Sequence, residues 1–575
     1  MRLRGSLKNI ALYGQSGEIR RTKLRLDANE NLWGPAPEVM NALKALAPED
    51  IAAYPDVRTL TAASARRFGV KPENVLLSNG ADEAIYALMA ALAGPGGRVV
   101  MPVPAFSVYT IAAKIQGGRV RGVPLGPDFA FPRSAFLRAI DRTTRLVVLI
   151  TPNNPTGTVI EKEDLEAVLQ KTSRHDLPVI VDETYAGFLN RTYVRLTCRF
   201  PNLIVVGSFS KYFALAGLRL GYTIARPELI VALRKLLQPY SVNAAALAAG
   251  EAALGAPDYY DGVRREIVGE RTKLAKAFKK IGLKAFSAGG NFFCVRVGPD
   301  ADRVRGRLAA SGILVKDFRA EPALSDCLRI SIGRPAENER LIAALETALP
   351  PEALLFDMDG VLVDVSASYR RAIIRTASRF LGTSVSPAEV DRLKLQPGMN
   401  NDWDATAALL RSRNVSIPRP ELIAVFQEFY RGNGVRPGFI ASERWMLPKP
   451  LLRDLASRYR LGIVTGRPLE EARLALRRSG TEEYFQVIIA LEDTGRRQKP
   501  DPYGLRLALR RLGVGRAVYF GDSPDDMAAA RDAGVTAVAV RPPGLRSPAG
   551  WGRRMKEAGA SRLDADLLTA MEKYL

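Results

Sequence analysis

Short apolar runs alternate with longer stretches of helical periodicity between about residue 36 and residue 240. Short apolar runs bounded by turn residues are typical of buried strands, and their regular alternation with helices predicts an α/β domain with a largely parallel sheet. The predicted strands cover residues 75–77, 98–101, 120–123, 145–151, 178–182 and 203–207. Polar residues that follow such strands meet at the carboxyl edge of the sheet, where we therefore expect an active site.

The pattern changes twice beyond residue 240. Residues 241–349 begin with helical periodicity and continue with short strands near 291–297 and 328–332, which predicts a smaller α+β domain. Pro350 and Pro351 interrupt this pattern, and a second α/β pattern runs from residue 353 to the end. We expect a large domain at about 36–240, a small domain formed by 1–35 with 241–349, and a second α/β unit at 352–575.

Composition and charge narrow the possible functions. The chain of 575 residues is 47% hydrophobic and 25% charged, as soluble globular proteins are, and it contains no apolar run long enough to span a bilayer. The formal net charge of +23 would suit nucleic acid or anionic substrates, but the basic residues are scattered, which favours anionic substrates. Three cysteines without metal or disulfide spacing favour a reducing, cytoplasmic location. The single histidine, His175, lies in a polar segment, so no catalytic step should require a histidine base.

A lysine lies at the centre of the first set of candidate catalytic residues. The strand predicted at 203–207 leads into Ser208, Ser210 and Lys211, and Arg219 follows. A lysine in this place can form a Schiff base with a carbonyl, and two hydroxyls with an arginine can hold a phosphate. A solvated lysine at a strand end is the commoner interpretation, so the hypothesis depends on partners upstream.

Four of the five earlier strands lead to residues suited to a phosphorylated aromatic cofactor. A glycine at a helix start lets main-chain N–H groups approach a phosphate, and an aromatic side chain can stack on a cofactor ring. An aspartate can pair with a protonated ring nitrogen, while an amide and a phenol can reach a ring oxygen. In chain order these residues are Gly80, Ala81 and Asp82, then Phe106, Asn154, Asp182 and Tyr185.

This ordered set resembles the fold-type-I pyridoxal-phosphate aminotransferases across residues 1–349, and most closely the histidinol-phosphate aminotransferase branch. The segments at 27–31, 54–56, 79–83 and 328–333 carry the resemblance to the branch. It implies that Lys211 carries pyridoxal phosphate and shuttles a proton. Asp182 would hold the pyridinium nitrogen, Tyr185 and Asn154 the phenolate oxygen, Phe106 the ring face, and Ser208, Ser210, Arg219 and the Gly80–Asp82 turn the phosphate.

The resemblance also implies a homodimer and a set of substrate contacts. Tyr54 would reach the cofactor phosphate of a second subunit, while Arg329, Asn29 and Lys316 would contact the substrate. Two departures leave the keto substrate open: Lys316 stands where the family often has an arginine, and residues 13–15 match the family only loosely.

The second α/β unit opens with a strand that ends in two aspartates, Asp357 and Asp359. One carboxylate can accept a phosphoryl group while the other handles the proton of the leaving group. An acidic turn is the common interpretation of such a pair, but three later segments argue against it here. They supply Thr465 and Gly466, then Lys499, and then Asp522 and Asp526, whose carboxylates suit Mg²⁺.

These segments resemble, in the same order, the motifs of the haloacid-dehalogenase superfamily of phosphohydrolases, across residues 352–575. The resemblance implies Asp357 as nucleophile, Asp359 as acid/base, and Thr465, Gly466 and Lys499 as phosphoryl ligands. Asp357, Asp522 and the main-chain carbonyl of Asp359 would bind Mg²⁺, supported by Asp526. Residues 366–449 have a helical pattern and would form a cap. The cap residues that are candidates for binding a cationic product are Asp402, Trp403, Asp404 and Glu428.

Together the two patterns predict a bifunctional α/β enzyme. Its first half would transaminate imidazole-acetol phosphate with glutamate, and its second half would hydrolyse the resulting histidinol phosphate, in histidine biosynthesis. The pairing is plausible because the product of the first reaction is a phosphomonoester. An alternative keeps both enzymes but assigns an aromatic or phosphorylated amino acid and a phosphoglycolate-like ester. Another is a basic nucleic-acid-binding protein with relic sites, against which the intact motifs argue.

Overall fold

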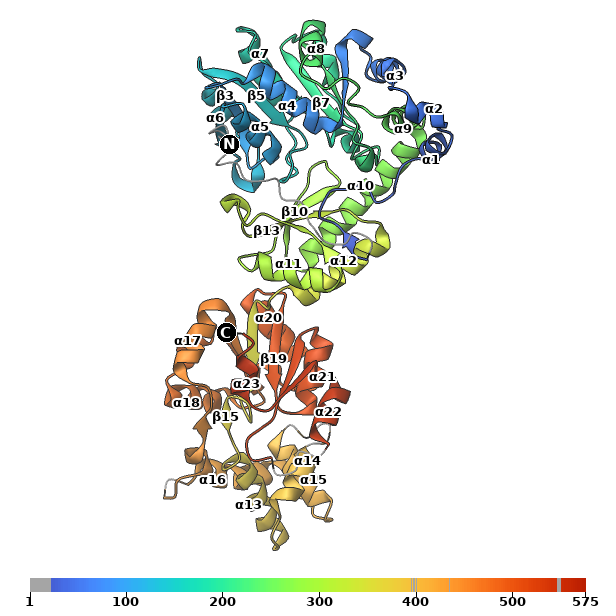
Figure 1. Ribbon diagram of the computed structural model, residues 1–575. Helices are drawn as coiled ribbons and strands as arrows, with labels where there is room; N and C mark the ends of the chain where they lie inside the picture. Colours follow the sequence, from blue (N-terminus) through green and yellow to red (C-terminus); the bar gives the residue numbers. More distant parts are fainter. Residues whose placement is uncertain are drawn as a thin grey trace, which may run out of the picture. The chain divides into compact units, whose positions relative to one another are not determined.

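The computed structural model describes residues 22–394, 396, 399, 401–433, 435–545 and 550–574. The chain divides into two compact units between Leu349 and Pro350, and each is described by itself (Figure 1). Residues 13–15 and the first part of the predicted N-terminal arm lie outside the described residues.

The first unit is built on a seven-stranded sheet. All of its strands run parallel except β8, which pairs antiparallel with both neighbours. In spatial order the strands are β2 (Val75–Ser78), β8 (Gly221–Ile224), β7 (Leu203–Ser208), β6 (Val179–Asp182), β5 (Thr144–Ile150), β3 (Arg98–Val103) and β4 (Arg119–Pro124). The predicted strands and the largely parallel sheet are therefore confirmed.

Helices cover both faces of this sheet, which explains why its central strands are apolar throughout. Side chains alternate along a strand, so Val148 of β5 packs with one core and Val147 with the other. One core lies under α4 (Gly80–Leu92), α5 (Ser107–Ile115) and α8 (Pro227–Arg234). The other lies under α3 (Arg58–Phe68), α6 (Arg133–Ala139), α7 (Lys162–Ser173), α9 (Ala244–Leu254) and α10 (Pro257–Lys280).

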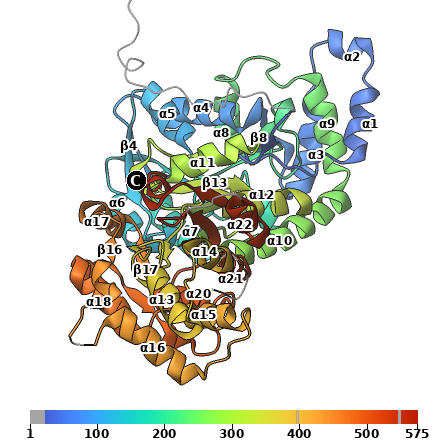
Figure 2. The ribbon, with the colours of Figure 1, turned by 90° about the horizontal axis from the view of Figure 1, so that it is seen from below.

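A smaller antiparallel sheet completes the first unit. Its order is β12 (Lys316–Asp317), β13 (Cys327–Ser331), β10 (Phe292–Arg296) and β9 (Lys284–Phe286), with α11 (Ala301–Ala310) and α12 (Pro335–Ala348) beside it. The N-terminal segment joins this region through β1 (Leu24–Arg25), which pairs parallel with β11 (Ile313–Leu314). That pairing carries Asn29 towards the residues at the carboxyl edge of the large sheet. Figures 1 and 2 both place α1 (Pro37–Lys44) and α2 (Pro48–Ala52) at an outer edge of this unit.

The second unit has a six-stranded sheet in which every pair is parallel. Its order is β18 (Val487–Ile489), β17 (Arg460–Val464), β14 (Ala353–Phe356), β19 (Ala517–Gly521), β20 (Thr536–Val540) and β21 (Arg562–Asp564). The helices of this fold are α17 (Lys449–Arg458), α18 (Leu469–Ser479), α19 (Leu491–Thr494), α20 (Tyr503–Leu512), α21 (Pro524–Ala533), α22 (Trp551–Ala558) and α23 (Leu567–Met571). The predicted α/β class holds for both units.

Four helices inserted after β14 form a separate layer with its own apolar core. They are α13 (Tyr369–Leu381), α14 (Pro387–Lys394), α15 (Asp402–Arg411) and α16 (Arg419–Arg431). Two short antiparallel strands, β15 (Val363–Asp364) and β16 (Arg444–Trp445), carry the chain into this layer and back. We call residues 365–443 the cap, and the rest of the second unit its core.

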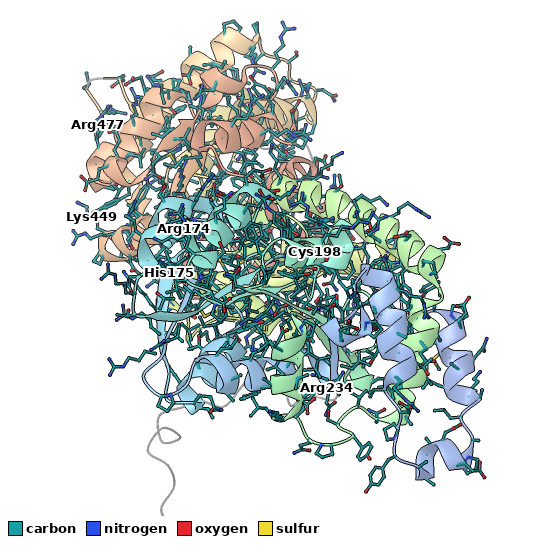
Figure 3. All side chains as sticks on the ribbon, turned by 90° about the horizontal axis from the view of Figure 1, so that it is seen from above. Arg174, His175, Cys198, Arg234, Lys449 and Arg477 are labelled. Carbon is teal, nitrogen blue, oxygen red and sulfur yellow. The ribbon has the colours of Figure 1, made fainter. Side chains whose placement is uncertain are left out.

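Two expectations about the surface can be compared with the structure. His175 lies exposed just after α7 (Figure 3), before the start of β6, whereas the candidate residues follow the ends of strands. Within the described parts of the chain, no helix combines the length and the apolar composition that crossing a bilayer requires.

Candidate active sites

Lys211 follows β7 at the carboxyl edge of the large sheet. Its Nζ donates a hydrogen bond to the main-chain oxygen of Ala28, 2.8 Å away, so the N-terminal segment closes over it. Burial, assisted by the positive charge of Arg329, lowers the pKa of Lys211 to about 8. A lysine with a lowered pKa has more of the neutral, nucleophilic amine near neutral pH than an ordinary lysine has.

The predicted phosphate ligands converge at the start of α4. Arg219 Nη1 lies 3.4 Å from Ser210 Oγ, and Arg219 Nη2 pairs with Asp82 at 2.9 Å. The main-chain N–H of Ser210 donates to Ser208 Oγ at 3.0 Å. Gly80 has φ +76°, and a Cβ there would lie 2.6 Å from Arg219 Nη2, so only glycine fits beside the guanidinium. The hydroxyls, the guanidinium and the N–H groups that begin α4 at Gly80 and Ala81 suit a phosphate.

Asp182 ends β6 and is only 4% exposed. Its Oδ2 accepts a hydrogen bond from the hydroxyl of Tyr109 at 2.9 Å, and its Oδ1 accepts one from the main-chain N–H of Thr184 at 2.9 Å. Burial raises the pKa of Asp182, because a low-dielectric surrounding disfavours the charged form. A protonated ring nitrogen would provide the positive charge that favours the carboxylate. The sequence did not indicate that Tyr109 contacts Asp182, because Tyr109 lies among the apolar residues of α5.

Two hydrogen bonds connect the predicted cofactor ligands with the predicted substrate ligands. Asn29 Nδ2 donates to Tyr185 Oη at 3.0 Å, and Arg329 Nη1 donates to Asn154 Oδ1 at 2.7 Å. Arg329 is 8% exposed, and within the described residues its Nε has no hydrogen-bond partner. A buried guanidinium with an unused N–H is suited to an anionic ligand such as a carboxylate.

The remaining predicted residues of the first site have different surroundings. Lys316 is directly opposite Arg329 in the β12–β13 pair, so both cations are on one face of the small sheet. Phe106 immediately precedes α5 and is partly buried. Tyr54 is 79% exposed, and its ring stacks on that of Tyr240 with centroids 4.4 Å apart.

A second pocket lies at the carboxyl edge of the six-stranded sheet, where the cap faces the core. It is lined by six of the seven residues predicted for phosphoryl or metal chemistry, namely Asp357, Asp359, Thr465, Gly466, Lys499 and Asp522. From the cap, α13, α14 and α15 also contribute to its walls. These residues are thus brought together from the ends of β14, β17 and β19 and from the segment that follows α19.

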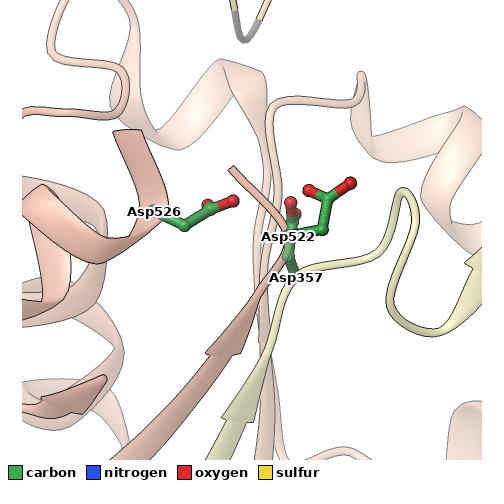
Figure 4. A group of neighbouring side chains, drawn as sticks. All are labelled: Asp357, Asp522 and Asp526. Atoms are coloured by element: carbon green, nitrogen blue, oxygen red, sulfur yellow. The ribbon is translucent and has the colours of Figure 1, made fainter. Parts of the chain in front are cut away.

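Three carboxylates form a compact group: Asp357 and Asp522, which line this pocket, and the buried Asp526 (Figure 4). One carboxylate oxygen from each lies within 4.8 Å of the others, a spacing that could hold a metal ion. Burial raises the pKa of Asp357 well above its usual range and that of Asp522 to about 7, and the neighbouring carboxylates add to both shifts. A divalent cation would relieve this repulsion. The expected metal contribution of Asp359 is its main-chain carbonyl, and its carboxylate is not part of the group.

Lys499 adds a positive charge to the same cluster. Its Nζ lies 3.0 Å from Asp357 Oδ1 and 2.5 Å from Asp526 Oδ1, and it donates to the hydroxyl of Tyr519 at 2.8 Å. Burial alone would raise the pKa of Asp526, but the charge of Lys499 and the hydrogen bonds from Lys499, Ser523 and Tyr519 together lower it. Asp526 and Tyr519 therefore hold the lysine beside the candidate nucleophile. Tyr519 was not predicted from the sequence.

Asp359 has a partner that the sequence did not suggest. The guanidinium of Arg467 donates to Asp359 Oδ1 and also pairs with Glu443 at 3.0 Å. Burial raises the pKa of Asp359 to about 6, although the charge of Arg467 opposes the shift. A carboxyl group with a pKa in this range can both donate and accept a proton near neutral pH.

Comparison with known proteins gives a family for the part of the chain that carries the first site. Residues 21–345 match the family profile described as aminotransferase class I and II. The chain belongs to this aminotransferase family. Histidinol-phosphate aminotransferase from Roseiflexus castenholzii is 37% identical over 336 residues, which cover 56% of this chain and 89% of that protein. The enzyme of that name from Desulfitobacterium hafniense is 37% identical over 354 residues, covering 60% of this chain and 96% of that protein.

A solved structure and a second family profile complete the comparison. Histidinol-phosphate aminotransferase from Sinorhizobium meliloti, in complex with pyridoxal-5'-phosphate, superposes with a TM-score of 0.56 and 28% identity, covering 60% of this chain and 97% of that one. Residues 351–534 match the profile described as haloacid dehalogenase-like hydrolase. The protein is thus an enzyme in which an aminotransferase is fused to a haloacid dehalogenase-like hydrolase domain, as we predicted from the sequence.

Proposed function

We propose that the enzyme catalyses two consecutive steps of histidine biosynthesis. Its first unit would convert imidazole-acetol phosphate and glutamate into histidinol phosphate and 2-oxoglutarate, and its second unit would hydrolyse histidinol phosphate to histidinol. One observation supports the pairing of these two reactions. The first unit is similar to histidinol-phosphate aminotransferases, and the second unit of the same chain has a pocket whose residues suit phosphoryl chemistry. We take residues 1–349 and 352–575 as the limits of the two enzymes, and the free thiols of Cys198, Cys294 and Cys327 support a cytoplasmic location.

The residues around Lys211 fit pyridoxal phosphate. The cradle at Gly80 and Arg219 is suited to its phosphate, the buried Asp182 to its ring nitrogen, and Tyr185 with Asn154 to its ring oxygen. When bound, this cofactor withdraws electrons from the carbon that gains or loses the amino group. Lys211 holds the cofactor by its Nζ, and its amine then moves the proton at that carbon.

Substrate recognition in this unit rests on two cations. Arg329, with its unused Nε, would bind the carboxylate of glutamate, and Lys316 beside it would attract the phosphate of the keto substrate. Asn29 positions Tyr185 through their hydrogen bond, and the Ala28 carbonyl covers Lys211. The N-terminal segment thereby limits the access of water to the reacting carbon.

We further propose that the first unit forms a homodimer through the edge that carries α1 and α2. Large apolar side chains are exposed there, including Met40 at 45%, Ile51 at 64%, Tyr54 at 79% and Tyr240 at 59%. A monomer rarely leaves such a group of side chains in water. In a dimer, the hydroxyl of Tyr54 would bind the cofactor phosphate of the neighbouring subunit.

Replacing Tyr54 with phenylalanine should therefore weaken cofactor binding without dissociating the dimer. Loss of one hydrogen bond to a charged phosphate corresponds to a rise of about tenfold in the Kd of pyridoxal phosphate. Fluorescence titration of the apoenzyme measures this Kd, and sedimentation velocity measures the dimer. Tyr86→Phe, at a tyrosine that is 38% exposed, serves as control. A fully active monomer at assay concentration would contradict the proposal.

The second unit hydrolyses the ester with Asp357 and Asp359. An Asp357 oxygen attacks phosphorus, the phosphorus–oxygen ester bond breaks, and the released alkoxide takes a proton from Asp359. Water then attacks the phosphorus while Asp359 accepts a proton from it, and the bond between phosphorus and the Asp357 oxygen breaks, which releases inorganic phosphate and restores the carboxylate. Lys499 and Thr465 would bind the phosphoryl oxygens. Asp357, Asp522 and the Asp359 carbonyl fit Mg²⁺, which would neutralise charge on the phosphoryl group, and Asp526 orders Lys499.

The cap provides charged and aromatic groups for the leaving alcohol. Of the four cap residues predicted, Asp402 and Trp403 line the pocket, whereas Asp404 pairs with Arg419 at the surface and Glu428 is exposed. Asp402 is ion-paired with Lys394 at 2.7 Å. An ammonium group of the substrate could take the place of Lys394 beside Asp402 or bind Asp402 together with it. Trp403 could stack on an imidazole ring.

Changing Asp402 to asparagine should reduce discrimination in favour of histidinol phosphate. We expect KM for histidinol phosphate to rise about tenfold, because a charged partner of its ammonium group is lost, with little change for phosphoglycolate. Steady-state phosphate release from both esters by the full-length protein provides the measurement. Asp404→Asn is the matched control, since that carboxylate lies outside the pocket. An equal rise for both esters would show that Asp402 does not contact the leaving group.

The proposal as a whole is tested by two substrate panels. The aminotransferase should use histidinol phosphate with 2-oxoglutarate at a higher kcat/KM than tyrosine, phenylalanine or phosphothreonine. With Mg²⁺, the hydrolase should prefer histidinol phosphate to phosphoglycolate. A clear preference for an aromatic amino acid or for phosphoglycolate would replace the corresponding half of the proposal.

A further inference from the structure

Arg467 is a charged residue that is almost completely buried. Its side chain is 1% exposed, and it immediately follows Thr465 and Gly466 beyond the end of β17. A buried guanidinium is tolerated only where carboxylates neutralise it and accept its N–H groups. Here two carboxylates do so, Asp359, which lines the pocket, and Glu443.

These two carboxylates belong to different layers of the second unit. Asp359 belongs to the core, directly after β14, whereas Glu443 ends the cap just before β16. Glu443 is itself fixed by the cap: its Oε1 accepts hydrogen bonds from Ser368 Oγ at 2.8 Å and from the hydroxyl of Tyr430 at 3.0 Å. Arg467 therefore bridges the acid/base candidate and the point where the cap rejoins the core.

A second cap residue contacts the same guanidinium. The ring of Tyr369, at the start of α13, lies with its centroid 5.0 Å from the Arg467 guanidinium carbon, close enough for a cation–π interaction. The hydroxyl of Tyr369 donates to Glu471 Oε2 of α18 at 2.6 Å, and Arg431 of the cap pairs with that carboxylate as well. Arg467 thus contacts the cap both near its beginning, at Tyr369, and at its end, at Glu443.

The geometry at Asp359 is asymmetric. Both N–H groups of Arg467 that reach this carboxylate, from Nε and Nη2, are directed to Oδ1. Oδ2 accepts no hydrogen bond from the described residues, so it can carry the proton that the departing alkoxide needs. A guanidinium fork on one oxygen fixes the rotation of the carboxyl group, which a single point charge would not do.

We propose that Arg467 is a positioning residue that aims Asp359 at the leaving-group oxygen only when Glu443 and Tyr369 of the cap are in place. This inference rests on the proposed phosphatase reaction, in which the ester oxygen takes its bonding electron pair from phosphorus and its proton from Asp359 Oδ2. An alkyl alkoxide is a poor leaving group and needs that proton, whereas p-nitrophenolate leaves without it. The consequence of disturbing Arg467 therefore depends on the leaving group.

The test compares two esters in the full-length protein with Mg²⁺. For Arg467→Lys, we expect the first-turnover rate of alcohol release from histidinol phosphate, or from the best alkyl ester of the panel, to fall about 100-fold. The first-turnover rate of p-nitrophenol release from p-nitrophenyl phosphate should change by less than about threefold, because this step does not need the proton of Asp359. Glu443→Gln keeps the guanidinium and removes one of its anchors, so a loss of about tenfold, again confined to the alkyl ester, is expected.

Arg478→Lys is the matched control. Arg478 is also an arginine of the core that bonds to the cap, donating to the carbonyls of Ile440 and Ala441 at 2.9 and 3.1 Å, but it does not bond to Asp359. Its replacement should leave the ratio of the two first-turnover rates unchanged. Equal losses for both esters in Arg467→Lys and in Glu443→Gln would overturn the inference and indicate a structural role. A wild-type protein that cleaves neither ester would instead overturn the proposed phosphatase function.

Discussion

Replacing Lys211 with alanine should abolish transamination, with a loss of more than about 10³-fold, while phosphate release by the same protein stays at the wild-type rate. The loss is large because one amine both holds the cofactor and moves the proton at the reacting carbon. The rest of the site, from the cradle at Arg219 to Asp182, remains intact, so the variant should still bind pyridoxal phosphate. Coupled assay of 2-oxoglutarate formation measures the first activity, and free phosphate the second.

Two observations would separate this role from a general effect on folding. Borohydride reduction of the wild-type holoenzyme should attach the cofactor to the peptide that contains Lys211, as peptide mass spectrometry can detect. Lys71→Ala, at a lysine whose side chain is 81% exposed, should retain both activities. Substantial transamination by Lys211→Ala would exclude this lysine as the catalytic amine.

Replacing Asp357 with asparagine should have the opposite effect on the two activities, with phosphate release lost and transamination retained. Phosphate release should fall more than about 10³-fold, because an amide oxygen is a far poorer nucleophile than a carboxylate. The change also removes one ligand from the carboxylate group formed with Asp522 and Asp526. Transamination should be unaffected, since every residue around Lys211 belongs to the first unit.

A conservative variant elsewhere in the hydrolase domain provides the reference for that experiment. Asp454 is 42% exposed and pairs with Arg458 within α17, so Asp454→Asn should release phosphate at the wild-type rate. Phosphorylation of wild-type protein by a slow substrate, trapped by acid and located by mass spectrometry, should place the phosphoryl group on Asp357. Finding it on another residue would reassign the nucleophile.

Residues that follow strands were predictable from the sequence, because strand order and strand ends determine where they lie. Lys211 after β7, Asp182 at the end of β6 and Asp357 after β14 all lie at carboxyl edges of sheets. Parallel strands bring such residues together whatever the rest of the chain does. This regularity made the two residue sets recognisable before any contact was known.

Contacts that depend on helix faces or on distant segments were not predictable. Tyr109 and Asp182 are 73 positions apart, and Arg467 and Asp359 are 108 apart, with no pattern that connects them. Tyr109 has the appearance of an apolar residue of α5, and Arg467 that of one more surface arginine in a strongly basic chain. Only the folded structure shows that each must find a buried partner, because an unpaired polar group in the interior is costly.

The most direct measurement of the coupled reaction uses full-length protein, pyridoxal phosphate, Mg²⁺, glutamate and imidazole-acetol phosphate in one mixture. Wild-type protein should release one phosphate for each 2-oxoglutarate formed, with histidinol as the end product. Asp357→Asn should form 2-oxoglutarate at the same rate and accumulate histidinol phosphate. Accumulation of histidinol phosphate by wild-type protein that rapidly cleaves a different ester would contradict the proposal that both units act in one reaction sequence.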